Sequence, residues 1–345
     1  MELFTPGPVN IKTAIKNNII NEYSHRCSDF HNLYYKCEVE TKKLFNMNND
    51  YISLFLTGSG TLSIESMIYS YIKYKKVLLL QNGFFSEKWE ILLKNYNTNY
   101  EKINFGWGNN FDYDLIEKQI IKNDYDGIFF VHHETSTTMI NDIYKINLLC
   151  DKYNIELYAD TVSSVGTYII DLNILNRLVL LGYSSNKGIG IYPGLAITIV
   201  KKTLFDFIND GLSYLNLGLY YKYSINKETP FTCCYQNFQY YYLSVKDIND
   251  NCKEKRFEYY NNLRDYLINK MKKINIKPYL TKNQCNWVIN FKYNNVIKLY
   301  NHLEKNKILI YKCKGILNKT HFQVGILNKT KKDIDDLINV IKTLV

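Results

Sequence analysis

The sequence predicts an α/β fold, with a large domain built on a mainly parallel sheet and a smaller α+β domain after it. Short apolar runs rich in β-branched residues alternate with longer amphipathic stretches, an order typical of βαβ units. The alternation stops after about residue 245, where charged helical sequence and short strand-like pieces follow. The 345 residues, 46% of them hydrophobic, suffice to bury a sizeable core.

The apolar runs define the expected elements of the large domain. Strands are predicted at Tyr51–Thr57, Lys76–Gln81, Gly127–His132, Ile155–Asp160, Leu178–Ser184 and Gly194–Val200. Amphipathic helices are predicted between several of them, at Leu62–Lys75, Glu87–Tyr96 and Ile143–Tyr153. Because such sheets bind ligands at the carboxyl ends of their strands, the residues that follow each strand are the first candidates for a site.

The second domain is expected to follow the helical stretch that begins at Val245 and runs to Ile274. Strand-like pieces follow at Asn286–Phe291 and Ile308–Tyr311, and a last helix at Lys331–Leu344. We therefore expect a large domain over residues 1–245 and a small one over residues 246–345.

Composition argues against several classes of partner. The net charge is +10, but most basic residues are scattered lysines, and only four arginines are present, so we expect no nucleic-acid partner. The eight cysteines include no CxxC pair and no clustered histidines, so no metal site is expected. No apolar run approaches the length of a membrane span, and free thiols in a reducing cytoplasm are the simplest expectation.

Three strand ends carry residues suited to chemistry. Gly58, Ser59, Gly60 and Thr61 follow a strand and open a helix, where free backbone N–H groups attract phosphate; an ordinary strand–helix turn would look the same. Asp160 ends a strand, where its carboxylate could pair with a ring nitrogen such as that of pyridoxal phosphate, or cap the next turn.

Lys187 ends the next strand, in the run Tyr183-Ser184-Ser185-Asn186-Lys187. A lysine among small polar residues at a strand end can form a Schiff base with an aldehyde. Lysine is common in this chain, and Lys187 is distinguished by its neighbours in the sequence. These are the acidic residue at the end of the preceding strand and the glycine-rich turn from Gly188 to Gly194. Together these residues predict a pyridoxal-phosphate enzyme.

At this point the chain resembles the class V aminotransferases of the fold-type I pyridoxal-phosphate enzymes. The likeness is greatest to the 2-aminoethylphosphonate–pyruvate branch, with the alanine–glyoxylate and serine–pyruvate branches next. The matching stretches are TPGPVN from Thr5, GSGTLSIE from Gly58, QNGFFS from Gln81, HHETSTTMIN from His132, ADTVSSVG from Ala159, SSNKGIGIYPG from Ser184, TPFT from Thr229 and FQVG from Phe322. The resemblance implies a seven-stranded sheet, a homodimer, an amine donor and a keto-acid acceptor.

The resemblance also implies a role for each matched residue. Lys187 would bind the cofactor and move the substrate proton, and Asp160 would pair with the ring nitrogen. The other implied cofactor contacts are Ser59, Gly60, Thr61 and Asn186 at the phosphate, Phe85 and Val162 at the ring faces, Thr135 at the 3-hydroxyl, and Thr229 reaching the phosphate of the neighbouring subunit. His132 would be structural, and His133 replaces a small residue of the family pattern.

One motif departs from the family. Where the resemblance expects an arginine that binds the substrate anion, this chain has Gln323, a loss of roughly 2–3 kcal/mol of binding free energy. Arg26, in a segment similar to one near the active site of the alanine–glyoxylate branch, could replace the missing cation, as could Lys312 or Lys314. Alternatively, the substrate differs from the usual amino and keto acids.

Three functions therefore stay open from sequence. The first is a transaminase acting on 2-aminoethylphosphonate and pyruvate, or on the substrates of the alanine–glyoxylate and serine–pyruvate branch. The second is a lyase or desulfurase on the same fold, for which Cys313 would have to be an activated thiol. The third is a cofactor-fold protein that has lost its activity.

Overall fold

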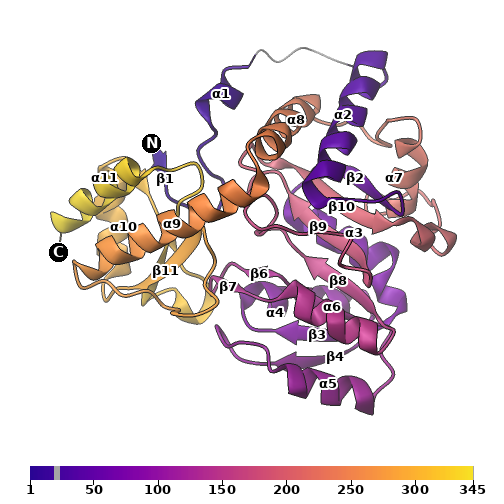
Figure 1. Cartoon of the computed structure of the whole chain (residues 1–345), viewed down its shortest axis with the longest axis horizontal. Coiled ribbons are helices and arrows are strands. Elements are labelled where there is room, and N and C mark those ends of the chain that lie inside the picture. Colours follow the sequence, from indigo (N-terminus) through magenta and orange to yellow (C-terminus); the bar gives the residue numbers. More distant parts are fainter. Residues whose placement is uncertain (19–23, 345) are drawn as a thin grey trace.

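The structure is a computed structural model and describes residues 1–18 and 24–344. Its centre is a seven-stranded sheet in the order β2-β10-β9-β8-β5-β3-β4 (Figure 1). The strands are β2 (Tyr51–Gly58), β3 (Lys76–Gln81), β4 (Asn99–Asn104), β5 (Gly127–Val131), β8 (Glu156–Asp160), β9 (Leu178–Ser184) and β10 (Gly194–Lys201). Only β10 runs antiparallel to its neighbours, so the prediction of a mainly parallel seven-stranded sheet is confirmed.

Helices cover both faces of this sheet, because its central strands are apolar on both sides. In β3, Leu78 and Leu80 pack into one hydrophobic cluster, while Val77 and Leu79 pack into another on the opposite face. The first cluster includes side chains of α2 (Ser28–Phe45), α5 (Tyr113–Lys122), α6 (Ile143–Lys152) and α8 (Tyr235–Asp250). The second includes side chains of α3 (Gly60–Ser70), α4 (Phe84–Asn95) and α7 (Leu217–Ser224).

Strand β4 was not predicted from the sequence, and its position explains why. It lies at the edge of the sheet, paired only with β3, and its sequence is Asn-Tyr-Glu-Lys-Ile-Asn. None of its residues is buried, so it has no apolar run to mark it. Polar and charged residues are typical of edge strands, where they discourage pairing with another chain.

The C-terminal part forms a three-stranded antiparallel sheet in the order β11-β14-β13, covered by helices. Its elements are α9 (Lys253–Lys272), β11 (Val288–Lys292), α10 (Val296–Lys305), β12 (Ile308–Leu309), β13 (Tyr311–Lys312), β14 (His321–Gly325) and α11 (Lys331–Lys342). The strand expected over Ile308–Tyr311 is thus two short strands with different partners. The helical stretch expected from Val245 is also divided, since α8 ends before Cys252, whose φ is 64°.

The N-terminal segment crosses to this C-terminal part. Strand β1 (Glu2–Leu3) pairs in parallel with β12, and Phe4 and Val9 belong to the third hydrophobic cluster together with Trp287. The expected domain boundary at residue 245 falls inside α8, whose Val245 packs with the large sheet. The division into two domains stays a proposal.

The remaining elements are short. Strands β6 (His133–Glu134) and β7 (Met139–Ile140) form a hairpin after β5, and α1 (Thr13–Lys16) follows the N-terminal segment. Across residues 1–18 and 24–344, no helix combines the length and the apolar character needed to cross a membrane.

Candidate active site

A cavity of about 280 Å³ lies where β2 and β9 end, closed on the other side by the N-terminal segment and the C-terminal sheet. It is lined by Pro6, Gly7, Ser59, Gly60, Thr61, Phe85, Lys88, Thr135, Ser136, Val162, Ser184, Asn186, Lys187, Tyr311, Lys314 and Gln323. A smaller hollow of about 40 Å³ adjoins it and reaches Asp160, Trp89 and His133. Nine of the predicted site residues therefore line the cavity, and Asp160 lines the hollow beside it.

The turn from β2 into α3 forms a cradle at the start of a helix. Ser59 is the N-cap residue of α3, and its own side chain makes no capping hydrogen bond to the first N–H groups of this helix. A Cβ atom at Gly60 would lie 2.7 Å from Cγ1 of Val162, so only glycine allows this close approach. The cradle therefore presents free N–H groups to the cavity, as phosphate binding requires.

Asp160 is a buried carboxylate that forms no ion pair with any residue the structure describes. Its Oδ1 accepts a hydrogen bond from the backbone N–H of Val162 at 2.9 Å, and its Oδ2 accepts one from Nε1 of Trp89 at 2.7 Å. Burial raises the pKa of Asp160 to about 7, an increase that these two hydrogen bonds oppose. A cationic group placed against this carboxylate would relieve the cost of burying it.

Lys187 follows β9, and its Nζ donates a hydrogen bond to the carbonyl oxygen of Pro6 at 2.9 Å. Burial lowers the pKa of Lys187 to about 8, with a smaller contribution from the charge of Lys314. A lysine with this pKa is partly neutral near physiological pH, as an amine that attacks an aldehyde has to be. Gly7 holds the segment close, because a Cβ there would lie 2.8 Å from Cδ of Lys187.

Glu134 fixes the helix that carries Phe85. Its carboxylate accepts hydrogen bonds from the backbone N–H groups of Phe85 and Ser86, at 3.2 and 3.0 Å, and from the hydroxyl of Ser136 at 2.5 Å. These contacts satisfy the first N–H groups of α4 with a negative charge at its N-terminus. The Phe85 ring is thereby held in the wall of the cavity.

Gln323 connects the small sheet to the hairpin that follows β5. Its Nε2 donates to the carbonyl oxygen of Thr135 at 2.7 Å, and the side chain is buried. Thr135 in turn donates through Oγ1 to the hydroxyl of Ser163 at 2.6 Å. The amide in the arginine position is thus engaged in a contact within the chain.

The sequence did not single out Trp89 or Lys88, both on α4. Trp89 holds Asp160, and Nζ of Lys88 donates to Oγ1 of Thr61 at 2.9 Å in the phosphate cradle. Both lie one helical turn after Phe85, at spacings of three and four residues, which place them on one face. That spacing was the signal that could have identified them.

Arg26 and Thr229 line neither hollow of their own chain. The guanidinium of Arg26 forms an ion pair with Glu228, and Oγ1 of Thr229 donates to the carbonyl oxygen of Phe231 at 2.8 Å. Because Glu228 precedes Thr229 directly, the two predicted residues share one region of the molecule.

The residues considered for other chemistry are buried. Cys313 does not line the cavity, and burial raises the pKa of its thiol, which disfavours the thiolate that a desulfurase needs. His133 donates through Nδ1 to the carbonyl oxygen of Ser163 at 2.9 Å, and its Nε2 has no partner among the described residues. Burial lowers the pKa of His133 to about 4, so it is a neutral ring with a free acceptor beside the smaller hollow.

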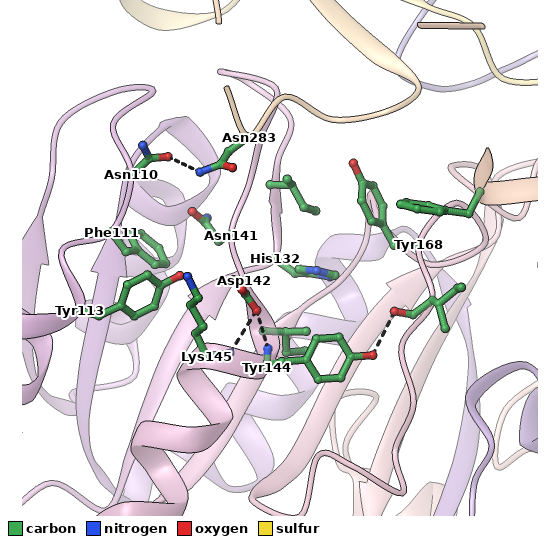
Figure 2. A pocket seen from close by; sticks show the side chains of 14 residues that line it. Asn110, Phe111, Tyr113, His132, Asn141, Asp142, Tyr144, Lys145, Tyr168 and Asn283 are labelled. Atoms are coloured by element: carbon green, nitrogen blue, oxygen red, sulfur yellow. Dashed lines mark hydrogen bonds between the residues drawn. The ribbon is translucent and has the colours of Figure 1, made fainter. Parts of the chain in front are cut away.

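A second cavity, of about 380 Å³, lies near the N-terminus of α6 (Figure 2). Its wall includes His132, whose Nδ1 is 2.9 Å from the hydroxyl of Ser164. Figure 2 shows the side chain of Asn283 bonded to Asn110, at 2.7 Å, and that of Asp142 bonded to the first N–H groups of α6. No predicted site residue lines this cavity.

The cavity beside Lys187 fits the pyridoxal phosphate expected from the sequence. Asp160 offers a carboxylate that no described residue pairs with, Lys187 an amine of lowered pKa, and the cradle at Gly60 a close backbone approach. A ring nitrogen, an aldehyde and a phosphate are the three groups that these features would accept.

Comparisons with known proteins agree with this arrangement. A family model described as aminotransferase class-V matches residues 10–213. A bifunctional phosphonoacetaldehyde hydrolase/aminoethylphosphonate transaminase of Clostridioides difficile is 25% identical over 99% of this chain, which spans 56% of that relative's length. A 2-aminoethylphosphonate–pyruvate transaminase of Bacillus cytotoxicus is 25% identical, over 98% of this chain and 96% of the relative.

Among solved structures, an alanine–glyoxylate aminotransferase from Nostoc sp. has a TM-score of 0.90. The match covers 99% of this chain and 94% of that one, at 19% sequence identity. At this identity the likeness establishes the fold.

Proposed function

The chain belongs to the class-V aminotransferase family, whose members are pyridoxal-phosphate-dependent enzymes of fold type I, and from this premise we propose that it transfers an amino group from a small anionic amine to a keto acid. The first candidates are 2-aminoethylphosphonate as donor and pyruvate as acceptor, which relatives of similar length carry in their names. The observation that carries the proposal is the presence, around one cavity and the hollow that adjoins it, of an amine of lowered pKa and a buried carboxylate that has no ion-pair partner among the described residues.

The cofactor, when bound, supplies an aldehyde that condenses with amines and a ring that withdraws electrons from the neighbouring carbon. Ser59, Gly60 and Thr61 would hold its phosphate, and Lys88 would add a positive charge at the same cradle. Asp160 would keep the ring nitrogen protonated, because a negative charge beside the ring favours its cationic form.

Lys187 has two tasks in this proposal. Its amine would hold the cofactor through the aldehyde, and its neutral form would be the base that accepts the proton from the amine-bearing carbon of the substrate. Its present hydrogen bond to Pro6 shows that Nζ can be directed by a neutral acceptor. Phe85 and Val162 line the cavity on the flanks that the ring would occupy.

We include a homodimer in the proposal. Thr229 lies away from its own cavity, as a residue that serves the neighbouring subunit has to, and Arg26 lies beside it through Glu228. If one of these residues enters the partner's site, the other is carried there with it. Mixing a Lys187→Ala chain with a Thr229→Val chain and measuring recovered activity tests the sharing of residues between subunits.

Spectroscopy of the first half-reaction tests the proposed function. Protein loaded with pyridoxal phosphate should change its visible absorbance when a donor is added, and pyruvate should then restore it with release of alanine. A panel with 2-aminoethylphosphonate, alanine and serine as donors, and pyruvate and glyoxylate as acceptors, separates the two branches of the family. A cofactor-loaded protein that reacts with none of these amines would contradict the transaminase proposal.

A further inference from the structure

The cavity carries more positive than negative charge. Lys88, Lys187 and Lys314 line it, and among the described residues Asp160 alone contributes a carboxylate to either hollow. The charge of Lys314 lowers the pKa of both other lysines. Such a cavity attracts anions, and it has more cationic groups than the cofactor phosphate alone requires.

Two of these lysines already have a task. Nζ of Lys88 bonds to Thr61 in the phosphate cradle, and Lys187 is the reactive amine. Lys314 has no hydrogen-bond or ion-pair partner among the residues that the structure describes. Its charge is therefore available to a ligand.

Aromatic rings hold Lys314 at the cavity. Its Nζ lies 5.3 Å from the ring centroid of Phe84, 5.7 Å from that of Phe85 and 5.9 Å from that of Tyr311. Cation–π contacts orient an ammonium group without neutralising it, unlike a carboxylate partner. The ammonium group is thus directed to the cavity with its charge intact.

The other candidate cations are engaged elsewhere. Lys312 lies with its Nζ 4.7 Å from the ring centroid of Tyr300 and does not line the cavity, and Arg26 is paired with Glu228. Gln323, in the expected arginine position, is bonded to Thr135. Since Tyr311 is paired with Gln323 across β13 and β14, Lys314 lies just beyond the neighbouring strand.

We propose that Lys314 binds the anionic group of the amino substrate, in place of the arginine that the family pattern expects at residue 323. The inference rests on the proposed transaminase function and names the substrate class: a short primary amine whose far end carries a phosphonate or similar tetrahedral oxyanion. A lysine acts as a compact point charge with three donors, whereas arginine matches a planar carboxylate through two parallel hydrogen bonds. A lysine in place of the arginine loses the two parallel hydrogen bonds but keeps the positive charge.

The test compares Lys314→Met and Lys314→Arg with the matched control Lys312→Met, which removes an exposed lysine of the same segment outside the cavity. Single-turnover rates of the cofactor-loaded proteins are measured with 2-aminoethylphosphonate, with β-alanine and with propylamine, which has no anion. We expect Lys314→Met to lower the apparent affinity for 2-aminoethylphosphonate about 10- to 100-fold, with β-alanine affected less and propylamine unchanged. Lys314→Arg should recover most of the loss, and Lys312→Met should behave as the unaltered protein.

A binding measurement keeps this test separate from that of the function. Isothermal titration of each variant with methylphosphonate needs no turnover, and Lys314→Met should bind it at least tenfold more weakly. If the unaltered protein turns over no amine but the titration difference persists, the proposed function fails and the anion subsite stands. Equal losses for propylamine and 2-aminoethylphosphonate, or an unchanged titration, would overturn the assignment of Lys314.

Discussion

The cavity beside Lys187 and the cavity of Figure 2 have similar volumes, about 280 and 380 Å³. Adjacent residues connect them, since His132 lines the second and His133 lines the hollow next to the first. Their polar groups differ. In the second cavity Asp142 caps α6 and Asn110 bonds to Asn283, whereas the hollow beside the first contains Asp160, a buried carboxylate that forms no ion pair with the described residues.

This difference teaches that unsatisfied polar groups indicate a site better than empty space does. A buried charge without a partner is costly, so a fold retains it where a ligand completes it. The described residues that line the second cavity include no buried carboxylate of this kind, since Asp142 is exposed and caps α6. Substitutions in the first cavity should therefore have large effects, and those in the second small ones.

The largest effect is expected for Lys187→Ala. Loss of the amine removes both the covalent contact and the base, so the rate of amino transfer should fall at least about 10³-fold. Borohydride treatment of the cofactor-loaded protein, followed by peptide mass spectrometry, should label Lys187 in the unaltered chain only. A label on another lysine would contradict the assignment.

Asp160→Asn should separate activity from stability. Without its negative charge the ring nitrogen loses its partner, and the rate of transfer should fall about 100-fold or more. Asp160 binds a proton more tightly in the folded cofactor-free protein, with a pKa near 7, than in the unfolded chain, so its contribution to stability declines as pH rises from about 4 to 7.

The asparagine variant removes this pH dependence. Since asparagine keeps one of the two acceptors, we expect a net gain of roughly 1–3 kcal/mol in the free energy of unfolding of the cofactor-free protein at pH 8. Urea denaturation at pH 5 and pH 8 measures it. If the asparagine variant were less stable than the unaltered protein at pH 8, burial of the ionised carboxylate would not destabilise the folded protein, and this prediction would be wrong.

Gln323→Leu tests the connection between the small sheet and the hairpin. It leaves the carbonyl oxygen of Thr135 without the amide donor in a buried position, at an expected cost of about 1–3 kcal/mol in the free energy of unfolding. Chemical denaturation gives the value. If the free energy of unfolding were unchanged, a water molecule would have to replace the amide as the donor to Thr135.

Lys314→Met should also shift a titration. Lys187 reacts with the cofactor as a neutral amine, so the rate of cofactor uptake should rise with pH and level off above about 8. Because the charge of Lys314 contributes to the lowered pKa, its removal should move the midpoint upward by up to about one pH unit. Stopped-flow absorbance at several pH values measures the midpoint, and Lys312→Met should leave it in place.

The smallest effect is expected in the second cavity. Lys145 lies there with its Nζ 5.3 Å from the ring centroid of Tyr113. We expect Lys145→Ala to change the transfer rate by less than about twofold, since surface substitutions away from a site have minor effects. A change in the transfer rate of more than tenfold would contradict the distinction drawn between the two cavities.

The sequence located the residues of the proposed cofactor end more readily than those of the proposed substrate end. Gly60, Asp160 and Lys187 each follow a buried strand, so a local pattern of apolar run and polar end locates them. Lys314 has no such context. It follows two short strands in a segment of mixed sequence, and its place depends on the packing of three rings from α4 and β13.

The fold shows the same division. Buried strands such as β3 and β9 were predicted to the residue, because each is a continuous apolar run. The polar edge strand β4 and the pairing of β1 with β12 escaped prediction, since long-range pairing leaves no periodic trace in two-residue strands.

The path of the first residues has a consequence for how the chain is made. The backbone N–H of Phe4 donates to Leu309, and its carbonyl oxygen accepts from the N–H of Gly325. The carbonyl oxygen of Pro6 accepts the hydrogen bond of Lys187. This segment is synthesised before Leu309 and Gly325, which follow it by some three hundred residues. The strands of the large sheet are therefore all made before the partners that hold the segment beside Lys187, so the surroundings of this lysine are completed later than the sheet.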